Sequence, residues 1–162
     1  MNAPMILSPE SLAKIDREIA KYPPDQKQSA VIAALAIAQQ EKGWLSTETI
    51  GFVAQYLGMP PIAAQEVASF YTMYDLKPVG RCKVAICTNL PCALQGAKAA
   101  AEHVKQKLGI DFGETTADGA FTLKETECMG ACGDAPVFII NNRKMLTAMT
   151  PDKIDKLIKE NQ

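Results

Sequence analysis

The sequence predicts an α+β protein in which a bundle of short helices is followed by a compact α/β unit. From residue 8 to about residue 74, apolar residues recur at helical spacing between turns that are marked by proline and glycine. After residue 80 the period changes to the alternation of a strand. The segment 75–80, Asp-Leu-Lys-Pro-Val-Gly, separates the two patterns. We therefore expect a helical domain over 1–76 and a second domain over 77–162.

Four helices are expected in the first domain. Residues 8–10 combine an N-cap serine, a proline at the first helical position and an acid in the first turn. The second helix spans 26–42 and is apolar over a wide arc, so we expect it at the centre of the bundle. Ser46 caps a third helix that Gly58 ends, and the proline pair 60–61 opens a fourth. This pattern predicts a small helical bundle.

The second domain is expected to alternate strands and helices. The pattern predicts a strand over 82–87, a helix over 93–108, strands over 120–123 and 137–140, and a last helix that Thr150 caps. The order β–α–β–β–α corresponds to a compact α/β unit of thioredoxin-like type.

Composition and charge exclude several classes of protein. The net charge of the 162 residues is −1, which gives no electrostatic reason to expect nucleic acid as a partner. No apolar run approaches the length of about 18 residues that spans a membrane. Residues 1–10 carry neither Lys nor Arg, which argues against a signal or transit peptide, so we expect a cytoplasmic protein. A mature chain trimmed of its transit peptide would look the same. Neither glycine-rich phosphate-binding motif is present, so we do not expect this chain to bind flavin or nicotinamide directly.

Four of the five cysteines form two tight pairs. Cys87 and Cys92 belong to C-T-N-L-P-C, Cys128 and Cys132 belong to C-M-G-A-C, and 35 residues separate the pairs. A chain without signs of secretion rarely pairs its thiols for packing alone. Thiolates from two loops that converge on one centre indicate a metal site.

The spacing of the pairs bears on which metal they bind. Zinc knuckles favour C-x2-C to C-x4-C around a single ion, whereas a two-iron cluster is wider and suits longer loops. Glycines at 130 and 133 would let backbone N–H groups approach the sulfur atoms. The spacing therefore favours a [2Fe–2S] cluster. A zinc-stabilised interaction module stays open as the alternative, and a disulfide framework ranks third.

The expected elements place the cysteine pairs on one rim of the α/β unit. Cys87 ends the first strand and Cys92 lies near the start of the next helix, where N–H groups favour an anionic cluster. The second pair lies between the two later strands. Cys82 shares a strand face with Val84 and Ile86, opposite to Cys87, so we expect a buried hydrophobic residue and not a ligand.

Other chemically suggestive residues receive structural interpretations. We expect His103 to be solvated, and no carboxylate or serine pattern accompanies it. Trp44 is expected to fix an interhelical turn, although it could anchor a partner. Phe70, Tyr71 and Tyr74 are expected to pack in the core at the domain junction. A thiol–disulfide oxidoreductase would need a C-x-x-C motif, which does not occur in the chain.

With these residues in view, the chain resembles the small thioredoxin-like [2Fe–2S] subunit of respiratory complex I, the NADH:quinone oxidoreductase. The resemblance covers nearly the whole chain. The matching segments are 43–45 (Gly-Trp-Leu), 67–74 (Val-Ala-Ser-Phe-Tyr-Thr-Met-Tyr), the two cysteine pairs, 113–123 and 127–136 (Glu-Cys-Met-Gly-Ala-Cys-Gly-Asp-Ala-Pro). Met129 stands where the family often has leucine, and Cys82 lies outside the pattern.

The resemblance implies that Cys87, Cys92, Cys128 and Cys132 ligate one [2Fe–2S] cluster. It also implies a flavoprotein partner that holds FMN, a four-iron cluster and the NADH site, and from which the cluster takes single electrons. This chain would have no catalytic residues, no activity in isolation and no direct membrane contact. It would lie in the peripheral arm of a quinone-reducing complex, at the inner face of the membrane. Similar subunits serve NAD-linked hydrogenases and formate dehydrogenases, and the sequence does not distinguish among these complexes.

Overall fold

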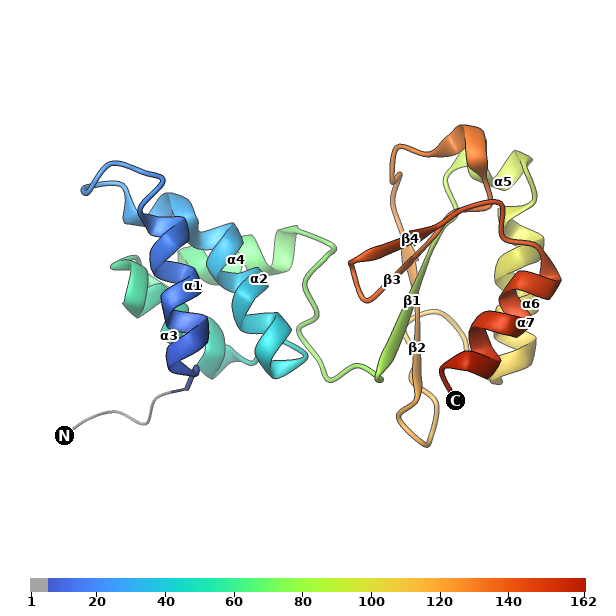
Figure 1. Cartoon of the computed structure of the whole chain (residues 1–162), viewed down its shortest axis with the longest axis horizontal. Helices are drawn as coiled ribbons and strands as arrows, with labels where there is room; N and C mark the ends of the chain where they lie inside the picture. The colour runs from blue at the N-terminus through green and yellow to red at the C-terminus, as the bar shows by residue number, and fades with distance from the viewer. Residues whose placement is uncertain (1–5) are drawn as a thin grey trace. The chain divides into compact units, whose positions relative to one another are not determined.

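The computed structural model describes residues 6–162, which form two compact units (Figure 1). One unit extends to Pro78 and the other comprises Val79–Gln162. Residues 1–5, on which part of the argument against a targeting segment depends, lie outside the described residues. In the described part of the chain, no helix is long and apolar enough to cross a membrane.

The first unit is a helical bundle. Its elements are α1 (Pro9–Ile19), the 3-10 turn η1 (Lys27–Ala30), α2 (Val31–Lys42), α3 (Thr47–Leu57) and α4 (Pro61–Phe70). The side chains of Ser8 and Ser46 accept hydrogen bonds from the backbone N–H groups of Ser11 and Thr49, so both act as the N-caps that the sequence predicts. The helix expected over 26–42 instead begins as a 3-10 turn, which is common at helix N-termini.

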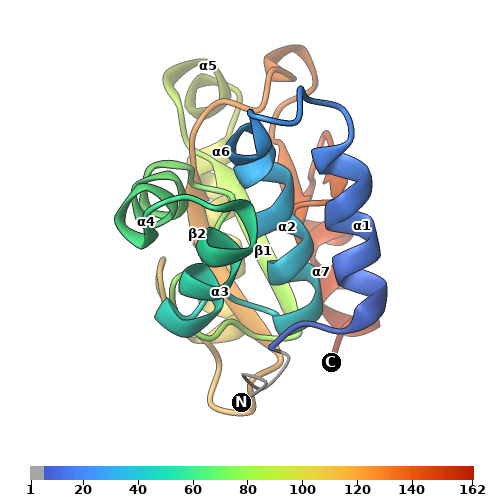
Figure 2. The ribbon, with the colours of Figure 1, turned by 90° about the vertical axis from the view of Figure 1, so that its left-hand side faces the viewer.

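Helix α2 is the central element of the bundle, as the sequence predicts. Ala34, Leu35 and Ala38 on this helix are fully buried. The small alanine side chains let α1, α3 and α4 pack closely against it, and Figure 2 shows α1 and α2 running side by side. The apolar arc of the sequence therefore corresponds to a helix that is surrounded by three neighbours.

The aromatic segment after α4 differs from the prediction. Tyr74 is buried and its hydroxyl donates a hydrogen bond of 2.7 Å to the carbonyl of Ile32. By contrast, Phe70 is 79% exposed and Tyr71 is 39% exposed. Core packing was thus the wrong expectation for these two rings. The reason is local: Phe70 is the last residue of α4 and lies on the helix face opposite the buried Ala64 and Ala68.

The second unit is a four-stranded sheet with helices. Its elements are β1 (Cys82–Cys87), α5 (Leu90–Leu94), α6 (Ala97–Leu108), β2 (Phe121–Thr126), η2 (Cys132–Asp134), β3 (Phe138–Ile140), β4 (Lys144–Leu146) and α7 (Pro151–Glu160). The strand order is β2-β1-β3-β4, with β1 and β2 parallel and the other two pairs antiparallel. Thr150 caps α7, as expected.

One face of β1 forms the main core of this unit. Cys82, Val84 and Ile86 are buried against α6 and α7. Cys82 is only 3% exposed, which confirms its interpretation as a small hydrophobic residue. Cys87 belongs to a separate cluster with Cys92, so the alternation of the strand directs the two cysteines to different surroundings.

Three features of this unit were not predicted. The single helix expected over 93–108 is two helices, because Gly96 adopts a φ of 92° that ends α5. The edge strand β4 was missed. Strand β1 is buried at all six positions, Lys83 included.

Candidate metal centre

The parallel pairing of β1 and β2 brings the two cysteine segments to one edge of the sheet. Cys87, the last residue of β1, lies in register with Thr126, the last residue of β2. Residues 127–137, here called the cysteine loop, follow directly and carry Cys128 and Cys132. Because parallel strands end on the same edge, both pairs lie at one rim of the unit, as the sequence predicts.

The four thiols differ greatly in burial. Cys87 and Cys92 are each 1% exposed and form a small core cluster with Ala97 and Val137. Cys132 is half-buried and Cys128 is exposed. The inner pair is thus fixed by the sheet and by α5, and the outer pair is supplied by the cysteine loop.

The thiols lie close to one another. The Sγ atoms of Cys128 and Cys132 are 3.9 Å apart. Two thiolates on one tetrahedral metal, with metal–sulfur bonds of about 2.3 Å, would be separated by about 3.8 Å. The Cys92 thiol hydrogen-bonds with both Cys87 and Cys132, so contacts run through all four sulfur atoms.

Burial and crowding disfavour negative charge on two of the thiols, those of Cys92 and Cys132. Burial, followed by the nearby Cys87 and Cys132 thiols, raises the pKa of Cys92 to about 12. The neighbouring Cys128 thiol and burial also raise the pKa of Cys132. Because metal ligands must be thiolates, a bound cation would have to supply the compensating positive charge.

Several hydrogen bonds hold the cysteine loop against the unit. The Gln95 side chain, just after α5, donates a hydrogen bond of 2.7 Å to the carbonyl of Cys132. The Gly130 N–H donates to Cys128 Sγ at 3.4 Å, and such donors to sulfur tune metal–thiolate sites. At the far end of the loop, the N–H of Cys87 bonds to the carbonyl of Val137. The contribution of Gln95 could not be recognised from sequence, because no local motif distinguishes it from the other glutamines of the chain.

The geometry of the described side chains does not match a site for one metal ion. Among residues 6–162, no set of three or more His, Cys, Asp or Glu residues is arranged to hold a single metal ion. His103 was expected to be solvated, but its Nε2 lies 2.7 Å from Asp155 Oδ1. Lys107 and then His103 lower the pKa of Asp155, and the three residues form a hydrogen-bonded cluster between α6 and α7.

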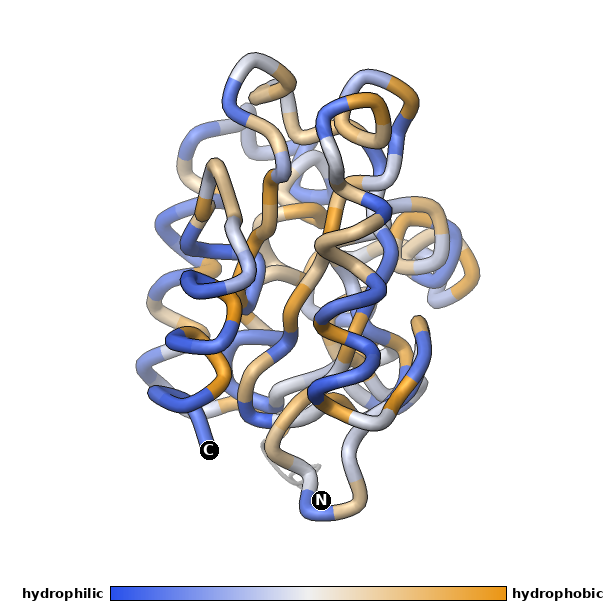
Figure 3. Tube along the Cα trace, turned by 90° about the vertical axis from the view of Figure 1, so that its right-hand side faces the viewer, coloured by the Kyte–Doolittle hydropathy of each residue, from blue (hydrophilic) through white to orange (hydrophobic). Residues whose placement is uncertain are grey.

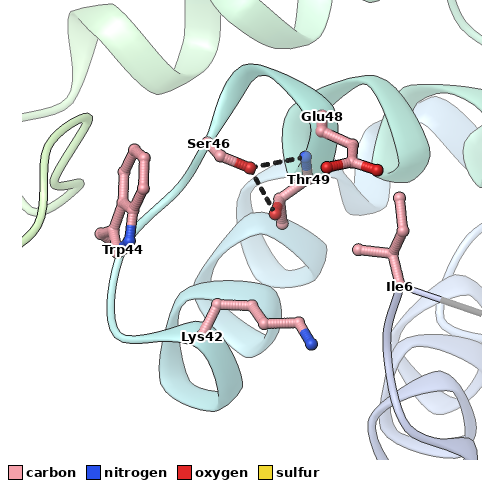
Figure 4. A pocket seen from close by; sticks show the side chains of 6 residues that line it. All are labelled: Ile6, Lys42, Trp44, Ser46, Glu48 and Thr49. Carbon is pink, nitrogen blue, oxygen red and sulfur yellow. Dashed lines mark hydrogen bonds between the residues drawn. The ribbon is translucent and has the colours of Figure 1, made fainter.

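A shallow pocket of about 390 Å³ surrounds Trp44 in the helical unit. Lys42, Glu48 and Ile6 line it together with the Ser46–Thr49 cap, and Trp44 itself is half-buried in the turn between α2 and α3 (Figure 4). The Ser46 and Thr49 hydroxyl groups are 2.9 Å apart and satisfy each other. The position of Trp44 in this turn is compatible with the expected structural role.

Comparison with known proteins decides the family. The model of the thioredoxin-like [2Fe–2S] ferredoxin family matches residues 15–162. The chain belongs to this family. The match spans both the helical and the α/β unit. The cofactor of the chain is accordingly a [2Fe–2S] cluster, and four thiols at one sheet edge are the ligand type that this group requires.

Relatives of this [2Fe–2S] protein are components of complex I. An NADH-quinone oxidoreductase component from Rickettsia bellii is 43% identical over 150 residues, which cover 92% of this chain and 89% of that protein. The corresponding component from Rickettsia conorii is 46% identical, over 86% of this chain and 84% of that protein. The mitochondrial NADH dehydrogenase [ubiquinone] flavoprotein 2 of Dictyostelium discoideum is 41% identical, over 96% of this chain and 65% of that protein.

Among solved structures, an NAD+-reducing [NiFe]-hydrogenase in the air-oxidized state is similar, with a TM-score of 0.68 and 26% identity. The similarity covers 79% of this chain and 22% of the hydrogenase chain. The fold and the family expected from the sequence are therefore confirmed.

Proposed function

We propose that Cys87, Cys92, Cys128 and Cys132 bind the [2Fe–2S] cluster, and that the chain is the electron-transfer subunit of an NADH:quinone oxidoreductase. The observation that carries the ligand set is the contact of two sequence-distant thiol pairs at one sheet edge. The fifth cysteine, Cys82, lies in a different core cluster and is left out of the set.

The bound cluster supplies reversible one-electron transfer, and it makes or breaks no bond in a substrate. The chain's own residues create the conditions for it. Burial of Cys87 and Cys92 keeps water from the inner side of the site. The Gly130 N–H partly offsets negative charge on the Cys128 sulfur, and Gln95 holds the loop in place.

The proposed partner is a flavoprotein subunit that carries FMN and binds NADH. Two leucines on α5 offer an apolar contact surface beside the site: Leu90 is 71% exposed and Leu94 is 79% exposed. They are four residues apart on one side of the helix, whereas Cys92 points into the unit. A partner that covers this surface would lie close to the inner thiols. The relatives' assignment to NADH-quinone oxidoreductase supports this proposal, with the chain in the peripheral arm at the cytoplasmic, inner face of the membrane.

A second candidate function is the equivalent subunit of an NAD-linked hydrogenase. Similarity to the NAD+-reducing hydrogenase favours it, at a TM-score of 0.68. The identity of 26% is well below the 43% found with the complex I component of Rickettsia bellii, which is why we place complex I first. Purification of the native complex distinguishes the two, because only one contains nickel.

The proposal is tested by replacing one inner ligand, Cys92→Ser, with Cys82→Ala as the matched control. We expect the native protein and the control to be brown, to contain acid-labile sulfide and to give a rhombic EPR signal on reduction. The Cys92→Ser protein is expected to lose most of the sulfide or to show an altered signal. In the assembled complex, NADH oxidation at the flavin and quinone reduction are measured separately.

Two results would contradict the proposed function. Colourless native protein with stoichiometric zinc and no sulfide would indicate the zinc-stabilised module instead. Loss of the cluster in Cys82→Ala but not in Cys92→Ser would show that the ligand set is wrong.

A further inference from the structure

A second feature of the α/β unit is a groove between the edge strand β4 and helix α7. Its volume is about 240 Å³. The groove is lined by Lys144, Leu146, Thr147, Met149, Lys153, Lys156, Leu157 and Glu160. The cysteines do not contribute to it, so it is a separate site from the metal centre.

The groove combines an apolar floor with a basic rim. Met149 is only 4% exposed, and with Leu146 and Leu157 it provides the apolar surface. On α7, residues 153, 156, 157 and 160 follow the helical period and share one face, while the buried Ile154 and Ile158 face the core. Figure 3 shows this helix, which leads to the C-terminus, as mostly hydrophilic with hydrophobic residues interspersed.

The positive charge of the rim is not balanced within the groove. Three ammonium groups face a single carboxylate, and that carboxylate, on Glu160, lies 3.7 Å from Lys156. The Nζ of Lys153 donates to the carbonyls of Thr147 and Ala148, which hold it at one end of the groove. A partner with negative charge would therefore be attracted by lysine charges that no carboxylate in the groove neutralises.

The wall formed by β4 is an open strand edge. In the described part of the chain, β4 is the last strand of the sheet. The N–H of Cys87 bonds to the carbonyl of Val137, and the N–H of Asn141 bonds to the carbonyl of Lys83. The backbone N–H and carbonyl of Ile139, which lies midway between Val137 and Asn141, therefore point toward β1. Backbone groups alternate in direction along a strand, so the N–H and carbonyl groups of Phe138 and Ile140 point toward β4. These two residues pair with Leu146 and Lys144. The N–H and carbonyl of Met145 must therefore point outward, toward the free edge.

We propose that this groove binds an extended acidic segment of another protein, which adds to the sheet as a strand beside β4. The outward N–H and carbonyl of Met145 would bond to the backbone of that segment. Alternate side chains would enter the groove, where apolar ones meet Leu146 and Leu157 and carboxylates meet the lysines. A second copy of this chain is disfavoured as the occupant, because it would present the same lysines to themselves.

The test uses the full, cluster-containing protein and a short fluorescent peptide that alternates glutamate and valine. We expect the peptide to bind, as measured by fluorescence anisotropy, and added salt to weaken the binding. Hydrogen–deuterium exchange should slow in residues 144–146. A peptide of the same length that alternates lysine and valine is the first control and should not bind.

Variants separate the charge contribution from strand addition. Lys144→Glu and Lys156→Glu should each weaken peptide binding about five- to tenfold, because each turns an attraction into a repulsion. Lys98→Glu on α6 makes the same charge change on an exposed surface outside the groove and should change affinity less than about twofold. Met145→Pro removes the outward N–H without breaking the ladder to β3 and should abolish binding, whereas Met145→Leu should retain it.

Four outcomes would overturn the proposal. They are the absence of peptide binding, equal binding of the lysine peptide, and unchanged affinity in Met145→Pro together with unchanged exchange at 144–146. The fourth is binding of phosphatidylglycerol vesicles but not of the peptide, which would assign the lysines to a lipid surface. If Met145→Pro does not fold, as judged by its cluster absorbance, the exchange measurement on the native protein decides alone.

Discussion

The hydroxyl of Tyr74 should make the free energy of unfolding of the helical unit decrease as the pH rises in the alkaline range. Tyr74 is 4% exposed, and its hydroxyl donates a hydrogen bond of 2.7 Å to the carbonyl of Ile32 on α2. Burial, followed by the nearby Tyr71, raises the pKa of Tyr74 from 10.0 to about 12. The substitution Tyr74→Phe removes the hydrogen bond and the ionisable group but keeps the ring.

The magnitude of the effect follows from these values. At neutral pH, loss of the hydrogen bond should lower the free energy of unfolding by about 1–2 kcal/mol. A pKa that is higher in the folded state means that the native protein keeps its full stability below pH 10 and loses it as the pH rises toward 12. A shift of about two units corresponds to about 2.7 kcal/mol. The Tyr74→Phe protein lacks this loss, so the two stability curves should cross at about pH 11.

Trp44 provides the assay, because it is the only tryptophan of the chain and belongs to the helical unit. Urea unfolding followed by its fluorescence, at a series of pH values from neutral to strongly alkaline, gives the free energy of that unit. Tyr22→Phe, at a residue that is 42% exposed, is the control and should change stability by less than about 0.5 kcal/mol. A stability difference between native protein and Tyr74→Phe that stays constant throughout the alkaline range would refute the reasoning.

Three further predictions concern other contacts. Gln95→Ala removes the hydrogen bond to the Cys132 carbonyl and should destabilise the attachment of the cysteine loop by about 1 kcal/mol. Loss of the cluster to a chelator, measured by visible absorbance, should become severalfold faster. An unchanged rate would contradict the anchoring role of Gln95. Gly80→Ala should destabilise the α/β unit by about 1–3 kcal/mol, because a Cβ there would lie 2.8 Å from the backbone of β2; native-like thermal unfolding of that unit would show that the contact can relax. Hydrogen bonds from Ser11 and Ser8 lower the pKa of Glu41 to about 2, so the helical unit should lose about 1 kcal/mol as the pH falls from 4.5 toward 2. Glu41→Gln should remove this acid dependence in urea unfolding, and an unaltered acid profile would exclude Glu41 as its source.

Local signals sufficed to predict the helical bundle. Ser8 and Ser46 cap helices because their hydroxyl groups meet unpaired N–H groups close by in the chain. Phe70 was misplaced because its aromatic character was weighed above its position on the helix face opposite Ala64 and Ala68. The full burial of β1 was not predicted, because it depends on tertiary contacts. Of its six residues only Lys83 is charged, and as a central strand it is covered by contacts from distant parts of the chain.

The metal centre was predictable in its candidate ligands but not in its construction. The two cysteine pairs, which begin at Cys87 and at Cys128, are visible in the sequence because a metal site needs thiols at close spacing. Whether they are the ligands remains a proposal that the Cys92→Ser experiment tests. The bond from Gln95 and the division into buried and exposed thiols depend on tertiary packing, and no local pattern encodes them. Gly96 divides the expected helix, and its role is recognised only from its positive φ.

Because the thiols differ in burial, chemical damage to the centre should begin at one of them. Cys128 lies in water, whereas Cys87 and Cys92 belong to the interior of the unit. A chelator or a peroxide from solution would therefore encounter Cys128 first, and oxidation would begin there. The inner thiols pack against Val137, and Met129 and Ala131 of the cysteine loop lie against the same cluster, so a loop disturbed by oxidation would also uncover them. We therefore expect damage to pass from Cys128 through the cysteine loop to Cys87 and Cys92.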